Sequence, residues 1–276
     1  MKNSALQSIS RFGNFLPHRQ RRFVLDQLGL GQLAQRLSAN SYCEVALPNG
    51  KSIIVNPLLH GQIAKDARLD YEEGALKAVK DHLGDGDVFY DIGANVGVFS
   101  FLAADWVGTT GAVCAFEPEE NNLKCFRRSL DRMQADNVRL FDIAVGARDG
   151  EMQFDRRGGA FSGRLVNQAM APDGETVSIS VRSLDSVIAE GAPRPTLVKI
   201  DVEGGEGDVL TGAQKILEVV RPAILCELHF FNPEGVARAL GALAKADYRC
   251  RSISGDVVDV TPDQTALPRH IIAIPN

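Results

Sequence analysis

The sequence predicts an α/β fold in which helices cover both faces of a mostly parallel, doubly wound sheet. The 276 residues suffice for one large domain with a buried core. Short apolar runs typical of buried strands alternate with segments of helical periodicity. The first of these strands passes into a helix through a glycine-rich turn at 93–97. In such sheets, ligands bind at the carboxyl ends of the strands.

An extension, residues 1–70, precedes the main domain at 71–276. Residues 1–40 predict a helical arm, although the basic first 25 residues also resemble an organellar transit peptide. We favour the arm, which offers a contact for a homo-oligomer. The alternating segment 43–55 predicts a β-hairpin, because a Pro-Asn-Gly sequence supplies its turn.

The main domain contains five predicted strands with their helices. A helix at 71–83 precedes the first strand. The strands are expected at 88–92, 112–116, 138–143, 197–202 and 223–228, with helices at 98–106 and 121–133. Two final segments, 248–253 and 270–274, predict an antiparallel hairpin at one edge of the sheet. An insertion at about 146–195 contains a glycine-rich stretch, which we interpret as a lid over the acceptor site.

The composition indicates a protein that acts on small molecules. A net charge of −5 and a pI near 5.6 argue against a nucleic-acid partner. The five cysteines are scattered without a Cys-x-x-Cys spacing, which predicts neither a zinc site nor a disulfide framework. No apolar run approaches the roughly 20 residues that span a bilayer, and no secretory leader is recognisable. We therefore expect a cytoplasmic protein.

The strongest local signal is the segment Asp91-Ile92-Gly93-Ala94-Asn95-Val96-Gly97, at the junction between the first strand and its helix. Glycines there let the backbone approach a ligand, and the helix N-terminus offers unpaired N–H groups. A nucleotide-type cofactor is implied, although tight packing of strand against helix requires glycine as well. Glu117 ends the second strand, where a carboxylate can accept hydrogen bonds from the hydroxyls of a ribose.

The glycine spacing favours S-adenosylmethionine over a dinucleotide. Dinucleotide folds use Gly-x-Gly-x-x-Gly to seat a pyrophosphate, whereas this turn has Gly-x-x-x-Gly preceded by an acid. Asp91 would repel a pyrophosphate but would balance the positive amino group or sulfonium region of S-adenosylmethionine. An NAD(P)-dependent oxidoreductase and a catalytically inactive binding protein of the same fold are the alternatives. The first lacks its expected Tyr-x-x-x-Lys pair.

The order of motifs resembles the FkbM-type methyltransferases, class I S-adenosylmethionine enzymes that commonly methylate hydroxyls of sugars or natural products. The resemblance runs from about residue 41 to 275. It is carried by the turn at 91–97, Phe-Glu-Pro at 116–118, Ile-Ala-Val-Gly at 143–146, Val-Lys-Ile-Asp-Val-Glu-Gly-Gly-Glu at 198–206 and Val-Leu-x-Gly-Ala at 209–213. It implies a Rossmann-like class I methyltransferase fold and O-methylation of a hydroxyl on a sugar, glycan or secondary metabolite, with N-methylation less favoured.

The resemblance also implies which residues bind the cofactor. The methionine part would be lined by the turn, through Asp91, Gly93, Ala94, Asn95 and Gly97. Glu117 would hold the ribose, and Asp142 would lie near the adenine. Glu72 belongs to the segment that resembles the family's entry element and would contact the cofactor as well, although Glu73 competes for that position.

Three side chains at the carboxyl ends of the fourth and fifth strands are the catalytic candidates: Asp201, Glu203 and His229. Methyl transfer to a hydroxyl requires a positioned acceptor and a group that takes its proton. Lys199 lies on the same side of the strand as Asp201 and, if paired with it, would keep Asp201 ionised. Glu206 is interpreted as an acid that suits the N-terminus of the following helix, and we place it outside the site.

A metal site is the weaker interpretation of the same region. Glu227 and His229 lie on one side of their strand, so together with Asp201 they offer oxygen and nitrogen ligands to a divalent metal. Their spacing is not a recognised ligand motif. We therefore expect no metal, and we interpret His229 as a base at the acceptor site or as an ordinary surface histidine.

Overall fold

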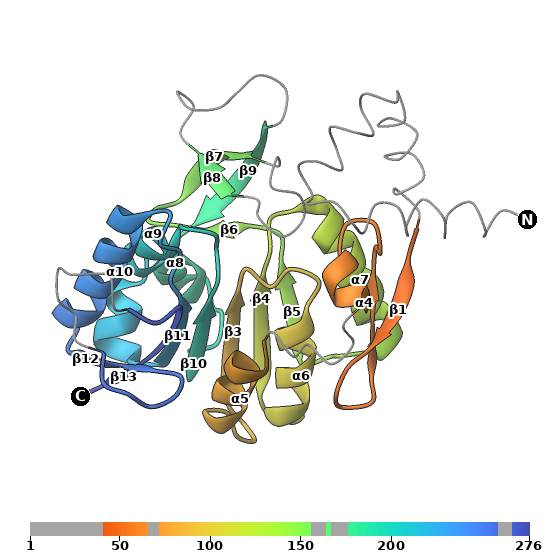
Figure 1. The fold of residues 1–276 in the computed structure, drawn as a ribbon, viewed down its shortest axis with the longest axis horizontal. Helices are drawn as coiled ribbons and strands as arrows, with labels where there is room; N and C mark the ends of the chain where they lie inside the picture. The colour runs from red at the N-terminus through yellow and green to blue at the C-terminus, as the bar shows by residue number, and fades with distance from the viewer. Residues whose placement is uncertain (1–40, 66–71, 156–163, 167–175, 259–266) are drawn as a thin grey trace, which may run out of the picture.

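A seven-stranded sheet with helices on both faces forms the centre of the computed structural model (Figure 1). The structure describes residues 41–65, 72–155, 164–166, 176–258 and 267–276. The predicted helical arm at 1–40 lies outside these residues.

The sheet has the strand order β12-β13-β11-β10-β3-β4-β5. Its five parallel strands are β3 (Val88–Ile92), β4 (Ala112–Phe116), β5 (Val138–Phe141), β10 (Leu197–Ile200) and β11 (Ala223–Glu227). β13 (His270–Pro275) runs antiparallel between β11 and β12 (Tyr248–Ser252). The predicted C-terminal hairpin is thus confirmed. The strand order reverses between β3 and β10, which marks the carboxyl edge of these strands as the place for ligands.

Successive residues of each central strand enter two different cores. In β3, Phe89 packs with α5 (Glu73–Asp81), α6 (Val98–Trp106) and α7 (Glu120–Met133). The next residue, Tyr90, packs on the opposite face with α8 (Leu184–Ala189), α9 (Glu206–Thr211) and α10 (Pro233–Lys245). Both faces are therefore apolar, which explains why the strands are continuous apolar runs. The doubly wound sheet predicted from the sequence is confirmed.

Side chains at the helix N-termini fix where three of these helices begin. The Glu119 carboxylate accepts hydrogen bonds from two backbone N–H groups of α7, and Ser183 caps α8 in the same way. Asn232 accepts from Gly235 N at 3.1 Å, and Pro233 occupies the first turn of α10. Such caps satisfy N–H groups that have no partner within the helix. A π-helical turn, η3 (Ile216–Val220), precedes β11.

The insertion after β5 contains a second sheet. Its strands β6 (Ala144–Val145), β7 (Gly150–Asp155), β8 (Arg164–Val166) and β9 (Thr176–Arg182) have the order β6-β9-β7-β8. Figure 1 shows this sheet above the main one. We interpreted the insertion as a lid, and the structure adds that these strands form part of it. The glycine-rich part at 156–163 lies outside the described residues, so its role as a lid stays a prediction.

The predicted N-terminal hairpin is confirmed as β1 (Cys43–Ala46) and β2 (Ser52–Val55), and α4 (Gly61–Lys65) follows it. The hairpin packs into the same core as α5 to α7, and Ile54 N donates to Ser129 Oγ at 2.8 Å. The extension is therefore part of the main core where the structure describes it. None of the described helices combines the length and the apolar character needed to cross a bilayer.

Candidate active site

The predicted cofactor turn joins β3 to α6 at the switch point of the sheet. Gly93 (φ 78°), Asn95 (φ 52°) and Gly97 (φ 92°) all adopt the left-handed backbone conformation. A Cβ on Gly93 would overlap the carbonyl oxygen of Asp201, and a Cβ on Gly97 would overlap the ring of Phe101. The two glycines are therefore required by packing within the protein. This bears out the packing role stated as the alternative, and the approach of a ligand to this backbone stays a prediction.

Asn95 supplies the part of the turn that fits a ligand. Its Oδ1 atom is buried and has no hydrogen-bond partner among the described residues. Leaving a buried polar atom unsatisfied costs about 1–3 kcal/mol, so such an atom needs a reason. Its backbone N–H donates to Glu117 Oε2 at 2.8 Å, so Asn95 adjoins the predicted ribose-binding carboxylate. The pair fits a ligand that carries hydrogen-bond donors.

Glu117 is 5% exposed at the end of β4. Its second oxygen, Oε1, accepts from Glu119 N at 2.8 Å. Burial raises the pKa of Glu117 to about 7, although the backbone N–H groups of Glu119 and Asn95 and the Asn122 side chain act in the opposite direction. Each carboxylate oxygen has more than one lone pair, so both remain able to accept from hydroxyls. Near neutral pH this group is poised between its two forms.

Asp91 lies beneath the turn and is fully buried. Its Oδ1 is 3.1 Å from Lys199 Nζ, and its Oδ2 accepts from Ser100 Oγ at 2.6 Å. Lys199 also donates to Gly93 O at 3.2 Å, so it binds both the acid and the turn. Lys199 compensates the charge of Asp91. Asp91 thus supports the turn from below, and its predicted contact with the positive part of a cofactor stays a prediction.

The three catalytic candidates come together beside this turn. Asp201 follows β10, and its backbone N donates to Ile92 O at 3.0 Å. His229 Nε2 lies 3.9 Å from Asp201 Oδ1 and 3.6 Å from Glu203 Oε2. Glu203 has a left-handed backbone (φ 52°), which is rare for a residue with a side chain and is common at functional sites. The fold thus places two carboxylates and one imidazole at one edge of the sheet.

The environment gives these groups different proton affinities. Burial raises the pKa of Asp201, and Lys199, 3.6 Å away, opposes that rise. The predicted pairing of Lys199 with Asp201 is confirmed, but its effect is smaller than that of burial, and the pKa of the acid stays above its ordinary value. Burial also raises the pKa of Glu203 to about 7. For His229 burial lowers the pKa, but the hydrogen bond to Glu206 and the surrounding carboxylates raise it to about 9.

Glu206 belongs to the site, contrary to our interpretation. It is fully buried, and its Oε1 lies 2.7 Å from His229 Nδ1. The same oxygen accepts from Gly204 N at 2.9 Å. Glu206 begins α9, as an acid suited to a helix N-terminus should, and its side chain also fixes the imidazole. No sequence signal links Glu206 to a histidine that lies 23 positions further along the chain, just after β11.

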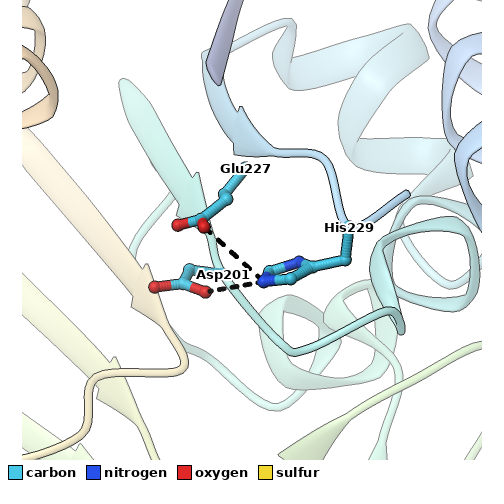
Figure 2. A group of neighbouring side chains, drawn as sticks. All are labelled: Asp201, Glu227 and His229. Carbon is cyan, nitrogen blue, oxygen red and sulfur yellow. Dashed lines mark ion pairs between the residues drawn. The ribbon is translucent and has the colours of Figure 1, made fainter. Parts of the chain in front are cut away.

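The remaining predicted residues flank this cluster. Glu72 is partly buried, and its pKa is raised. Burial is the main cause and the charge of Asp201 adds to it, whereas Lys199 acts in the opposite direction. Glu227 ends β11, and it is bound by His270, the first residue of β13, and by Arg269, which precedes that strand. Figure 2 shows Glu227, Asp201 and His229 converging from the ends of two strands. Asp142 follows β5, where it is exposed and pairs with Arg127 at 3.1 Å.

One buried network was not visible in the sequence. His60, in the extension, is fully buried and hydrogen-bonds through Nε2 to Asn122 Oδ1 at 2.9 Å. The Asn122 side chain in turn hydrogen-bonds to Glu117. His60 Nδ1 accepts from Asn56 N at 3.2 Å, so Nε2 carries the proton that it donates. The extension therefore helps to position the predicted ribose-binding carboxylate.

Three comparisons with known proteins bear on this site. A family model described as the methyltransferase FkbM domain matches residues 91–250, more than half of the chain. The hexuronic acid methyltransferase AglP of Haloferax volcanii is 26% identical over 171 residues, which cover 61% of this chain and 67% of that protein. The methyltransferase FkbM structure from Methylobacillus flagellatus KT is 17% identical with a TM-score of 0.46, over 76% of this chain and 60% of that one.

The fold and the site define a class I methyltransferase, with a Rossmann-like sheet that ends in an antiparallel hairpin. The chain belongs to the FkbM methyltransferase family. The resemblance stated from the motifs is thus confirmed. The match favours a methyltransferase over the alternative of a nicotinamide oxidoreductase. The chain spans less than two thirds of the Methylobacillus protein.

Proposed function

We propose that this chain is an S-adenosylmethionine-dependent O-methyltransferase whose acceptor is a hydroxyl of a sugar or a related small molecule. One observation carries the proposal. The turn that suits the cofactor and the strand end that carries the acids are in direct contact, because no side chain fits between Gly93 and the carbonyl group of Asp201. A methyl donor held by the turn would thus face the catalytic candidates.

The residues of the turn fit the cofactor. Glu117 would accept hydrogen bonds from the ribose hydroxyls. Asn95 Oδ1, which is buried and has no partner in the part of the chain that the structure describes, would accept from a donor of the methionine part. The N–H groups at the start of α6 would face its carboxylate. When bound, S-adenosylmethionine supplies an electrophilic methyl group on a sulfonium.

Glu203 is the residue that we assign to the acceptor proton. In the reaction an oxygen–carbon bond forms as the carbon–sulfur bond breaks, and the hydroxyl proton goes to a base. The side chain of Glu203 is 26% exposed, so an acceptor can reach it. Both ring nitrogens of His229 face carboxylates, Nδ1 towards Glu206 and Nε2 towards Asp201 and Glu203. We therefore assign His229 the role of holding the acids in place, in preference to that of base.

A sugar acceptor is supported by the relative in Haloferax, a hexuronic acid methyltransferase. Acids at the carboxyl edge also suit an acceptor rich in hydroxyls, which donate hydrogen bonds to carboxylates. The acceptor would lie on the side of Asp201 and Glu203 that faces away from the core.

The proposal is tested first by calorimetric titration of the full chain with S-adenosylhomocysteine, with NAD and NADP as controls. We expect binding of S-adenosylhomocysteine alone. Methyl transfer to a panel of hexoses and hexuronic acids is then followed by the mass of one added CH₂ group. Glu203→Gln should lower kcat by roughly 10²–10⁴-fold and leave S-adenosylhomocysteine binding intact. Asp208→Asn, an exposed acid on α9, is the matched control and should keep full activity.

Failure of S-adenosylhomocysteine to bind, or binding of NAD in its place, would refute the cofactor assignment. Binding without transfer to any acceptor would support the alternative of an inactive binding protein. A Glu203→Gln variant with unchanged kcat would show that another group takes the proton.

A further inference from the structure

Asp201, Glu227 and His229 form a compact group of metal-binding side chains. Each offers one ligand atom, and these atoms all lie within 4.8 Å of one another. His229 Nε2 is 3.6 Å from Glu227 Oε1 and 3.9 Å from Asp201 Oδ1 (Figure 2). The three residues come from the ends of adjacent strands, β10 and β11. The fold therefore brings together the three residues that the sequence analysis offered as the weaker, metal-binding interpretation.

Glu206 fixes the imidazole in the orientation that a metal ligand requires. Its buried carboxylate lies 2.7 Å from His229 Nδ1, so Nδ1 keeps its proton in that hydrogen bond. Nε2, which is directed at the two acids, is the nitrogen that would give up its proton to a bound cation. Metal-binding histidines commonly donate their other N–H to a carboxylate in this way. The second oxygen of Glu206, Oε2, is buried without a hydrogen-bond partner among the described residues. A cation bound at Nε2 would stabilise the buried negative charge of Glu206, which lies on the other side of the ring.

Negative charge exceeds positive charge around the group. A third carboxylate borders the group, because Glu203 Oε2 also lies 3.6 Å from His229 Nε2. Lys199 is a buried cation on this side, but it is shared between Asp91 and Asp201, and the exposed Arg269 guanidinium binds Glu227. Carboxylates this close together repel one another unless a cation lies between them.

We propose that Asp201, Glu227 and His229 bind a divalent cation of the Mg²⁺ or Mn²⁺ class. Two carboxylates with one imidazole form a mostly oxygen ligand set, which suits these ions and leaves coordination positions for an acceptor. The role of the ion rests on the function proposed above. A hydroxyl bound to the cation loses its proton more easily, and Glu203 is placed to take that proton. This replaces our expectation of no metal, which relied on ligand spacing along the chain.

Arg269 competes for this site. Its guanidinium binds Glu227 Oε1, the oxygen that faces His229. The Arg269 side chain is 69% exposed, so it can leave that oxygen for water at little cost when a cation arrives. His270, 3.3 Å from Oε2, continues to orient the carboxylate from the other side.

The test uses the full chain, freed of metal with a chelator and titrated with MnCl₂ under electron paramagnetic resonance. We expect one Mn²⁺ per chain, with binding lost in Asp201→Asn and in Glu227→Gln. Glu206→Gln should weaken Mn²⁺ binding by about 10- to 100-fold, because it releases the imidazole. Asp208→Asn is the matched control and should bind Mn²⁺ as the wild type does. Failure of the wild type to bind, or wild-type affinity in both ligand variants, would overturn the proposal.

A measurement on the wild type covers variants that do not fold. Bound Mn²⁺ should broaden the ring-proton NMR signals of His229 before those of His82, which follows α5 near the opposite end of the sheet. The reverse order would also overturn the proposal. Titration with S-adenosylhomocysteine separates the two hypotheses. If it binds and Mn²⁺ does not, the metal site is wrong and the proposed function stands. If Mn²⁺ binds and S-adenosylhomocysteine does not, the proposed function is wrong and the metal site stands.

Discussion

Binding of S-adenosylhomocysteine is predicted to depend on pH through Glu117. Burial raises the pKa of this carboxyl to about 7, and ribose hydroxyls donate hydrogen bonds to the ionised form. With a pKa of 7, about one tenth of the chains are ionised at pH 6 and about nine tenths at pH 8. The affinity for S-adenosylhomocysteine is therefore high above pH 7, where Glu117 is ionised, and falls below it. Kd should rise about tenfold from pH 8 to pH 6, or about 1.4 kcal/mol.

Calorimetric titration at constant ionic strength between pH 6 and 8 measures this dependence. Glu117→Gln cannot ionise, so its weaker binding should no longer vary with pH. Glu203 has a pKa of about 7 as well, which makes Glu203→Gln the matched control, and this variant should keep the tenfold change. Circular dichroism shows whether each variant is folded. A flat profile in the wild type, or an unchanged profile in Glu117→Gln, would refute the reasoning.

Three further predictions concern the support of the site. Asn122→Leu removes a hydrogen bond that lowers the pKa of Glu117, so the midpoint of the binding profile should move above pH 7, and an unmoved midpoint would contradict the network. His60→Leu removes the partner of a buried amide oxygen and should lower the free energy of unfolding, measured in urea, by about 1–3 kcal/mol. Gly93→Ala places a side chain on left-handed backbone, where it would overlap the carbonyl oxygen of Asp201. It should lower the free energy of unfolding by about 2–5 kcal/mol. Gly191 has φ 96° and open space around it, so Gly191→Ala should lower the free energy of unfolding by only about 1–2 kcal/mol. Equal losses of stability in the two variants would show that the clash at Gly93 is relieved.

The main sheet could be predicted because its strands are buried on both faces. Such strands are apolar except at the positions that enter the site, and the runs in β3, β4 and β11 stand out from any helical pattern. The second sheet could not be predicted in full. β7 mixes Glu151 and Gln153 with Met152 and Phe154, and of these four only Phe154 is buried. A polar strand of this type does not differ from a loop by composition.

The candidate site was predicted in part, for a related reason. Asp201 and His229 could be located because the ends of parallel strands share one edge. The pairing of His229 with Glu206 depends on how α9 packs beside β11, and no local pattern encodes that packing. His60 lies in an extension that looks separate in the sequence, and only the packing of the extension on α7 brings it to Asn122. Partners chosen by tertiary packing are thus the part that local sequence signals do not reveal.

Asp201, Glu203 and Glu206 show how packing divides the roles of similar residues. They lie within six positions of one another, and by residue type each could serve as ligand, base or helix cap. Glu206 is fully buried against the imidazole, which leaves it no route to an acceptor. Asp201 is bound to Lys199 on one side and faces His229 on the other. Glu203 alone combines partial exposure with a left-handed backbone that turns it away from the strand. Proton transfer at Glu203, ion binding at Asp201 and orientation by Glu206 follow from these three environments.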